Sequence, residues 1–298
     1  LEDDETKPQP AVQKTTRLIS ENVQMIFGAV SSASTIAMMN AIPVLAEIDE
    51  SLTIDPTKIE ALITPKTKAI MITNPGNPTG TCLTEAQMKM LLDVAVAHDL
   101  YLVADEVYRE FTYDGEPLHS FGKFDYGQEN LILIDSVSKR FSACGARIGC
   151  VITRNAELYN NAMKWCQGRL CASTIDQVAS AALYTVGPEY FAAVRDEYKK
   201  RRDTLVRKLR EIPGVIFDCP KGAFYLMAAL PVDNADTFQR WLLEEFRYND
   251  RTVMLAPAAG FYGTPGLGRN EVRIAYVLKR EDLLAAAECM KEALKVYP

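Results

Sequence analysis

Lys68-Ala-Ile-Met-Ile-Thr-Asn-Pro-Gly-Asn-Pro-Thr-Gly80 is the stretch that decides the predicted fold. Its first six residues suit an apolar strand, and the Asn-Pro and Gly residues that follow are a dense turn signal. A helix is predicted over residues 84–99, because Thr84 is followed three residues later by Gln87 at capping-box spacing. A strand, a turn and a helix in this order predict the start of a βαβ unit.

The same alternation continues along the chain. Further strands are predicted over residues 101–105, 131–135 and 148–152. Residues 155–210 are helical by pattern, with breaks near Cys171 and Gly187-Pro188. Strands separated by helices predict an α/β fold with a mostly parallel sheet flanked by helices.

The pattern changes after Pro213-Gly214. Short strands are predicted over residues 215–217, 224–227, 252–255 and 272–276, and helices over residues 237–247 and 281–296. These elements predict a smaller α+β domain at the C-terminus. We expect a large domain over residues 1–185 and a small C-terminal domain over residues 186–298.

Composition narrows the classes of function. The chain has 298 residues and a net charge of −6, so nothing in it favours nucleic acid or an anionic membrane as a partner. We expect neither a membrane-spanning segment nor a leader. The seven cysteines are scattered without a CxxC pair, which is typical of reduced thiols and predicts a cytoplasmic protein.

The chain contains two histidines, His98 and His119. A Ser-His-Asp triad or a histidine-rich metal site would need one of them at the active site, and His98 suits the end of a helix instead. We therefore expect no metal, and we assign acid–base chemistry to lysine, tyrosine or carboxylate side chains.

Polar side chains follow three consecutive predicted strands. They are Asn74–Gly80, then Asp105 with Tyr108, then Ser136 with Lys139. In open parallel sheets, ligands bind beyond the carboxyl ends of the strands, so these side chains should meet at one edge. Together they suit an aromatic aldehyde cofactor. Lys139 can form a Schiff base, while Asp105 can hold a ring nitrogen protonated.

Other polar groups complete this hypothesis. Tyr108 and Asn77 can contact a ring oxygen, and Ser136 and Arg147 can hold a phosphate. Each residue also has an ordinary structural interpretation. Lys139 and Arg147 can be loop cations in water, Asp105 a cap or turn former, Asn77 a turn former, and Tyr108 an amphipathic aromatic. Arg273 is the hardest to explain in this way, because it lies in a predicted strand between apolar residues and needs an anionic partner.

Four motifs in order carry a family resemblance. They are Asn74-Pro-Gly-Asn-Pro-Thr-Gly80, Ala104-Asp-Glu-Val-Tyr108, Ser136-Val-Ser-Lys-Arg-Phe-Ser-Ala-Cys-Gly-Ala-Arg-Ile-Gly149 and Val272-Arg-Ile-Ala-Tyr276. From residue 64 to the end, the sequence resembles the class I/II aminotransferases, pyridoxal-phosphate enzymes of the aspartate aminotransferase fold (fold type I). The resemblance implies a homodimer that uses pyridoxal 5'-phosphate. It also implies a cis proline in the turn after residue 73.

The resemblance also implies a role for each matching residue. Lys139 would be the lysine of the internal aldimine and the later proton shuttle, and Asp105 would pair with the pyridine nitrogen. Tyr108 and Asn77 would contact the ring oxygen. Ser136, Ser138 and Arg147 would bind the phosphate, and Arg273 would bind the substrate α-carboxylate. Asn77 is assigned to substrate binding as well.

The N-terminal third departs from the family pattern. Residues 28–41 and 55–63 predict helices, the second capped by Asp55, and residues 43–48 predict a strand. Residues 1–27 read as an arm or as an incomplete N-terminal part. Gly28–Ser34 is a candidate for the family's phosphate turn and Phe27 for its ring-stacking aromatic, both out of the usual register. Three explanations of this departure stay open: internal residues are absent from the sequence, the chain is an atypical member of the family, or it is a degenerate one. We adopt the first explanation.

The implied activity is transfer of an amino group between an amino acid, aspartate or another small or acidic one, and a 2-oxo acid. Two alternatives stay open from the sequence. One is a pyridoxal-phosphate-dependent lyase, because the lysine, aspartate and arginine are common to both reactions. The other is a catalytically impaired ligand-binding protein on the same fold.

Overall fold

The computed structural model describes residues 56–117 and 119–298. The described residues belong to two units, one with residues 56–64 and Lys164–Leu170, the other with residues 65–117, 119–163 and Cys171–Pro298. In the first unit, α3 spans Pro56–Leu62, which agrees with the predicted helix. Its predicted cap Asp55, Phe27, Gly28–Ser34 and the elements predicted over residues 28–48 lie outside the described residues. The expected boundary at residues 185/186 stays a prediction.

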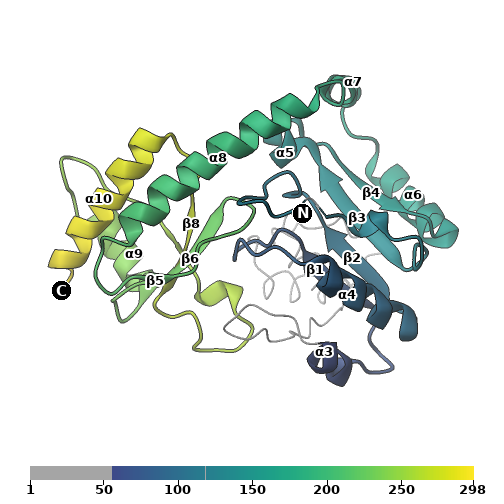
Figure 1. The fold of residues 1–298 in the computed structure, drawn as a ribbon, viewed down its shortest axis with the longest axis horizontal. Helices are drawn as coiled ribbons and strands as arrows, with labels where there is room; N and C mark the ends of the chain where they lie inside the picture. Colours follow the sequence, from purple (N-terminus) through teal and green to yellow (C-terminus); the bar gives the residue numbers. More distant parts are fainter. Residues whose placement is uncertain (1–55, 118) are drawn as a thin grey trace, which may run out of the picture. The chain divides into compact units, whose positions relative to one another are not determined.

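The first sheet has the strand order β1-β2-β3-β4 (Figure 1). Its strands are β1 (Ala69–Thr73), β2 (Tyr101–Asp105), β3 (Leu131–Ser136) and β4 (Gly149–Thr153). The first three are parallel, and β4 runs antiparallel to β3. The predicted strands and the mostly parallel sheet are confirmed, and the reversed β4 is a feature that the strand pattern did not predict.

Helix α4 (Glu85–Ala97) connects β1 to β2 and packs against β2. The Thr84 hydroxyl accepts a hydrogen bond from the Gln87 N–H at 3.2 Å, and Gln87 Oε1 accepts one from the Thr84 N–H at 2.9 Å. This is the predicted capping box, which satisfies two backbone donors at the helix start. The buried face of α4 contains Met88, Leu91, Leu92, Val94 and Ala95.

The helical region breaks where the sequence predicted. The helices are α5 (Val137–Arg140), α6 (Ala156–Arg169), α7 (Thr174–Leu183) and α8 (Pro188–Leu209), with short 3₁₀ turns at Phe121–Lys123, Cys144–Ala146 and Ala259–Phe261. Pro188 takes the first turn of α8, where its missing N–H costs no hydrogen bond. The chain passes along α8 from the first sheet to the second (Figure 1).

The second sheet is antiparallel throughout, in the order β5-β6-β8-β7. Its strands are β5 (Ile216–Phe217), β6 (Tyr225–Ala229), β7 (Ala256–Pro257) and β8 (Glu271–Ala275). Helix α9 (Ala235–Glu244) lies near β7, and α10 (Arg280–Val296) packs against α8.

The strand predicted over residues 252–255 is wrong. The structure places a two-residue strand at Ala256–Pro257 instead. The reason is that α9 takes the polar groups of the preceding segment. The Thr252 hydroxyl donates to the Leu242 carbonyl at 2.6 Å, and the Leu255 N–H donates to Gln239 Oε1 at 2.5 Å. A backbone donor held by a side chain is not available to a β ladder.

Backbone hydrogen bonds join the loops after β1 and β2 to the residues that precede β6. The Gly80 carbonyl accepts from the Lys221 N–H at 2.9 Å and from the Gly222 N–H at 2.8 Å. The Phe111 carbonyl accepts from the Ala223 N–H at 2.9 Å. The second sheet is therefore attached to the carboxyl-end loops of the first.

The loop after β2 also supplies side chains to the core of the second sheet. Tyr108, Phe111 and Tyr113 are buried in one cluster with residues of α8, β6 and β8. The ring of Phe111 meets Phe224 edge-on, with centroids 5.2 Å apart. Burial of these aromatics contributes on the order of 2 kcal/mol each. Side-chain packing and backbone hydrogen bonds thus both attach the loop after β2 to the second sheet.

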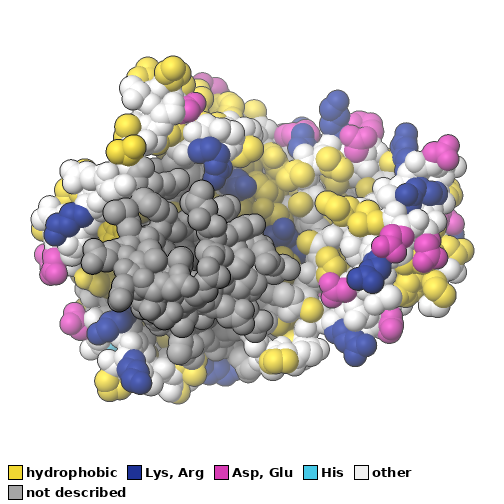
Figure 2. Space-filling view, turned by 180° about the vertical axis from the view of Figure 1, so that it is seen from behind, with side chains coloured by type: hydrophobic (Ala, Val, Ile, Leu, Met, Phe, Trp, Pro, Cys, Tyr) yellow, Lys and Arg dark blue, Asp and Glu magenta, His cyan; other side chains and the backbone are white. Residues whose placement is uncertain are grey.

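The described surface carries both signs of charge. In Figure 2, Lys and Arg side chains lie among Asp and Glu side chains on the face shown, with apolar side chains between them. None of the described helices combines the length and the apolar character needed to cross a membrane.

We expect Gly80→Ala to lower the free energy of unfolding by about 3 kcal/mol, because strain and a clash add. Gly80 has φ +71°, and a Cβ there would lie 2.4 Å from Pro220 Cβ and 2.7 Å from the Tyr225 carbonyl oxygen. Gly115 is the matched control, because it has φ +81° with open space around it. Gly115→Ala should cost only about 1 kcal/mol. Urea unfolding measures both, and equal losses would contradict the close approach.

Candidate functional site

The carboxyl ends of β1, β2 and β3 lie side by side. In the parallel register, Thr73 pairs with Asp105, and Asp105 pairs with Ile134. The turn of residues 74–80, the loop that begins at Asp105, and helix α5 therefore start at one edge of the sheet. Both Asn-Pro bonds in the turn are cis.

Lys139 lies on α5, partly buried, in an aromatic setting. Its Nζ atom is 5.9 Å from the ring centroid of Tyr108 and 5.8 Å from that of Phe224. No hydrogen bond or ion pair joins this amine to any other described side chain. An amine between aromatic faces, with no carboxylate bound to it, is free to react with a ligand carbonyl.

Asp105 is the last residue of β2 and is half-buried. Burial raises the pKa of its carboxyl, and the negative charge of Asp135 adds to the rise. The Val107 N–H, which donates to Asp105 Oδ1 at 3.1 Å, and the nearby Lys139 ammonium both lower this pKa. A carboxylate in such a setting is stabilised by a cationic ligand group.

A row of side chains links Tyr108 to Arg273. The Tyr108 and Tyr225 hydroxyls share a hydrogen bond of 3.0 Å. The Arg273 guanidinium lies 4.6 Å from the Tyr225 ring centroid and 5.0 Å from that of Phe261. Arg273 Nη1 donates to Asn77 Oδ1 at 2.9 Å. Four of the predicted site residues, Lys139, Tyr108, Asn77 and Arg273, are thus connected directly or through one aromatic ring.

Arg273 keeps an unused donor. Its Nε is buried and has no hydrogen-bond partner among the described residues. A buried donor without an acceptor costs about 1–3 kcal/mol, so an anionic ligand that supplies the acceptor is favoured. Burial and the hydrogen bond with Tyr225 also raise the pKa of the Tyr108 phenol, which keeps it protonated.

The residues predicted to bind phosphate are not connected to one another in this way. Ser136 accepts from the Ser138 N–H at 3.2 Å and so caps α5. Arg147 is exposed at φ 55°, and its Nη1 donates to the Cys144 carbonyl at 2.8 Å. No hydrogen bond joins Arg147 to either serine in the described part of the chain.

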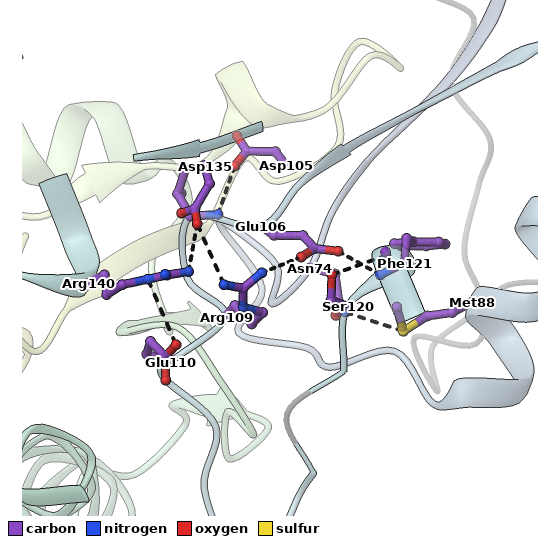
Figure 3. Close-up of polar contacts among 12 residues, drawn as sticks. Asn74, Met88, Asp105, Glu106, Arg109, Glu110, Ser120, Phe121, Asp135 and Arg140 are labelled. Carbon is purple, nitrogen blue, oxygen red and sulfur yellow. Dashed lines mark hydrogen bonds and ion pairs between the residues drawn. The ribbon is translucent and has the colours of Figure 1, made fainter. Parts of the chain in front are cut away.

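Sequence reasoning missed Tyr225 and Phe261, which border Arg273. It also missed a row of ion pairs next to Asp105, drawn in Figure 3. The row includes Asp135 and Arg140, which flank the predicted Ser136–Lys139 motif on either side. The sequence did contain a signal for these two residues, because Asp135 directly follows an apolar run and Arg140 directly follows Lys139.

Comparison with known proteins identifies the family and the fold. A match to the family of class I and II aminotransferases covers residues 24–288. The chain belongs to this family. Its α/β fold with a mostly parallel sheet is that of solved class I and II aminotransferases. The aromatic aminotransferase from Pyrococcus horikoshii superposes with a TM-score of 0.78 at 29% identity, over 90% of this chain and 71% of that one.

Other relatives agree. An aspartate aminotransferase structure from Thermus thermophilus has a TM-score of 0.78 at 27% identity, over 89% of this chain and 68% of that one. Curated relatives include aromatic-amino-acid aminotransferase 2 of Thermococcus litoralis, 31% identical over 85% of this chain and 64% of its own length. The aspartate aminotransferase of Bacillus subtilis is 33% identical over 82% of this chain and 62% of its length. The chain thus spans less than two thirds of these curated relatives.

We expect the hydroxyls of Tyr108 and Tyr225 to be energetically coupled in this protein. Tyr108→Phe or Tyr225→Phe leaves the remaining hydroxyl without its partner, so the double variant should cost less than the sum of the two. The coupling free energy should be about 1 kcal/mol in urea unfolding. Tyr262→Phe is the control partner, because its hydroxyl donates to Glu271 in a solvent-exposed hydrogen bond. An equal coupling between Tyr225→Phe and Tyr262→Phe would contradict the assignment.

Proposed function

We propose that the protein is a pyridoxal-phosphate-dependent aminotransferase that moves an amino group between an amino acid and a 2-oxo acid. The observation that carries the proposal is the unpaired amine of Lys139 in contact with Tyr108, which connects through Tyr225 to Arg273. We further propose aspartate or another acidic or small amino acid as the substrate. The names of the curated relatives support this, and one of them is an aromatic-amino-acid enzyme.

The groups at the site fit pyridoxal 5'-phosphate and an amino-acid substrate. An amine, a half-buried carboxylate and a protonated phenol match an aldehyde, a basic ring nitrogen and a ring oxygen. The orphaned Nε of Arg273 matches a substrate carboxylate. When bound, the cofactor supplies the aldehyde that takes up the amino group and a ring that withdraws electrons.

The residues then have separate roles. Lys139 Nζ binds the cofactor and later carries the proton at the substrate α-carbon. Asp105 stabilises the proton on the ring nitrogen, while Tyr108 and Asn77 contact the ring oxygen. Arg273 binds and orients the substrate α-carboxylate, and Asn77 holds that guanidinium by the bond already present. Ser136, Ser138 and Arg147 are the proposed phosphate ligands.

The organisation of the whole protein is also a proposal. We propose a large domain over residues 1–185, a small domain over residues 186–298, and a cytoplasmic homodimer. Support for the division comes from the two sheets, since β1 to β4 end at Thr153 and β5 begins at Ile216. Support for the dimer and the compartment comes from the family resemblance and the scattered free cysteines.

A single-turnover experiment tests the activity. Protein loaded with pyridoxal phosphate and mixed with aspartate should yield pyridoxamine phosphate and the 2-oxo acid in equal amounts. Lys139→Ala should abolish both the imine absorbance and the turnover, whereas the exposed control Lys89→Ala should change neither. In a parallel mixing with cysteine, whose β-thiol is a leaving group, release of sulfide, ammonia and pyruvate without pyridoxamine phosphate would indicate a lyase. An absorbance unchanged in Lys139→Ala would refute the proposed cofactor attachment.

We expect Arg273→Ala to lower kcat/KM for every amino-acid substrate by about 100-fold, the loss expected of charge-assisted hydrogen bonds to a carboxylate. The dissociation constant for pyridoxal phosphate should stay within about twofold, because Arg273 is assigned to substrate rather than cofactor. Arg269→Ala is the control, an exposed arginine near β8. Steady-state kinetics and absorbance titration measure the two quantities. Equal loss of cofactor and substrate affinity would overturn the assignment.

A further inference from the structure

Charged side chains of alternating sign form a row next to Asp105 (Figure 3). Arg109 Nη1 binds Glu106 Oε2 at 3.0 Å, and Arg109 Nη2 lies 3.6 Å from Asp135 Oδ2. Arg140 Nη2 binds the same Asp135 oxygen at 2.6 Å, and its Nε lies 3.8 Å from Glu110 Oε1. Asp135 is therefore held between two guanidinium groups.

Three members of the row are buried, with exposed fractions of 1% for Glu106, 6% for Asp135 and 8% for Arg140, while Arg109 and Glu110 are partly exposed. Buried charges are costly unless each has a partner, and breaking such a pair leaves the remaining charge uncompensated. Hydrogen bonds from the backbone complete the pairing. The Phe121 N–H donates to Glu106 Oε1 at 2.8 Å, and the Ser136 N–H donates to Asp135 Oδ1 at 2.8 Å.

The row adjoins both chemically important residues. Glu106 follows Asp105 in the chain, and Arg140 follows Lys139. On α5, the side chains of Val137 and Arg140 are buried, whereas Lys139 is partly exposed toward Tyr108 and Phe224. The ion pair of Arg140 thus fixes one side of a four-residue helix and leaves the amine on another.

The charge of Asp135 acts on Asp105. The charged and titratable groups that face Asp105 are Asp135 from β3, Lys139 from α5 and Tyr108 from its own loop. Asp135 raises the pKa of Asp105 and Lys139 lowers it, while burial gives the largest rise. A second carboxylate near a buried one disfavours ionisation unless its charge is neutralised.

We propose that Arg140 and Arg109 are positioning residues that neutralise Asp135, so that Asp105 stays ionised for the cofactor ring nitrogen, and that Arg140 also anchors the helix presenting Lys139. This inference rests on the proposed function, because it concerns the partner of the ring nitrogen. It assigns a role to a motif of this chain, Asp135-Ser-Val-Ser-Lys-Arg140, that extends beyond the reactive lysine.

The test measures the affinity for pyridoxamine 5'-phosphate against pH. This probe has no aldehyde, so its binding does not depend on reaction with Lys139. Below the pKa of Asp105 the carboxyl is neutral and its pairing with the protonated ring nitrogen is lost. Affinity therefore falls on the acid side, with a midpoint that follows Asp105. Titration of the ligand itself is common to all variants and cancels in the comparison.

The two central variants should shift this midpoint in opposite directions. Arg140→Gln leaves Asp135 less neutralised, raises the pKa of Asp105, and should move the acid midpoint up by about half a pH unit. Asp135→Asn removes the repelling charge and should move the midpoint down by a similar amount. At a fixed pH on the acid limb, each shift corresponds to about a threefold change in the dissociation constant.

Controls separate charge from structure. Arg140→Lys keeps the charge and should keep the midpoint, although it loses the planar contact and some stability. Arg202→Gln breaks the ion pair of another buried arginine, with the exposed Asp114 at 2.6 Å, and this arginine contacts Tyr113 rather than Asp105. It should lower the unfolding free energy, measured in parallel, without moving the midpoint. A purely structural role for Arg140 predicts the same behaviour for Arg140→Gln and Arg202→Gln.

Opposite shifts in Arg140→Gln and Asp135→Asn support the inference. Shifts in the same direction, or no shift in either, overturn it while the proposed function stands. If Arg140→Gln does not fold, Asp135→Asn decides alone: a downward shift supports the inference and an unchanged midpoint overturns it. If the wild-type protein binds neither pyridoxal phosphate nor pyridoxamine phosphate, the proposed function fails and the inference fails with it.

Discussion

The carbonyl of Gly80 accepts two backbone hydrogen bonds from Lys221 and Gly222, and the candidate site depends on this connection. It joins the turn after β1 to the segment that enters β6. Two glycines permit the approach, since a Cβ on Gly222 would lie 2.7 Å from Pro75 Cβ and one on Gly80 would lie 2.4 Å from Pro220 Cβ. Because the bonds are between backbone groups, the path of the chain itself brings Tyr225 to Tyr108.

The site separates satisfied charges from unsatisfied ones. Behind the sheet edge, each buried carboxylate has an arginine or a backbone N–H as a partner. In front of it, the buried Arg273 Nε is left without an acceptor among the described residues, and the partly exposed Lys139 amine has aromatic rings as neighbours. A buried unsatisfied donor lowers stability by about 1–3 kcal/mol, and a ligand that satisfies it regains this free energy on binding. The polar groups in front are therefore suited to binding, and those behind to holding them in place.

Local signals in the sequence predicted the elements well. The Thr84 capping box and the Gly187-Pro188 break act over a few residues, so the sequence alone suffices for them. The reversal of β4 depends on the connection over residues 137–148, which holds only one turn of helix. One such turn rises about 6 Å, whereas a five-residue strand is about 16 Å long, so the helix cannot return the chain to the starting edge.

The strand predicted over residues 252–255 was wrong for a different reason. Side chains of α9 compete for the backbone of residues 252–255, and such competition is visible only in three dimensions. The same limit applies to the site. Motif order indicated Lys139, Asp105 and Tyr108, but Tyr225 is 117 residues from Tyr108 in sequence. No sequence periodicity connects residues so far apart, so a site residue that belongs to no motif cannot be predicted from the sequence.

The ion-pair row also has to be electrically balanced. Its members are the carboxylates Glu106, Asp135 and Glu110 and the guanidinium groups of Arg109, Arg140 and Arg195. A row with excess negative charge would favour protonation of Asp105 and weaken its hold on a cationic ring nitrogen. Equal numbers of both signs keep the field at Asp105 small, while the buried pairs still fix α5 and the loop after β2. Arginine suits this role better than lysine, because it stays charged when buried and can bind two carboxylates at once.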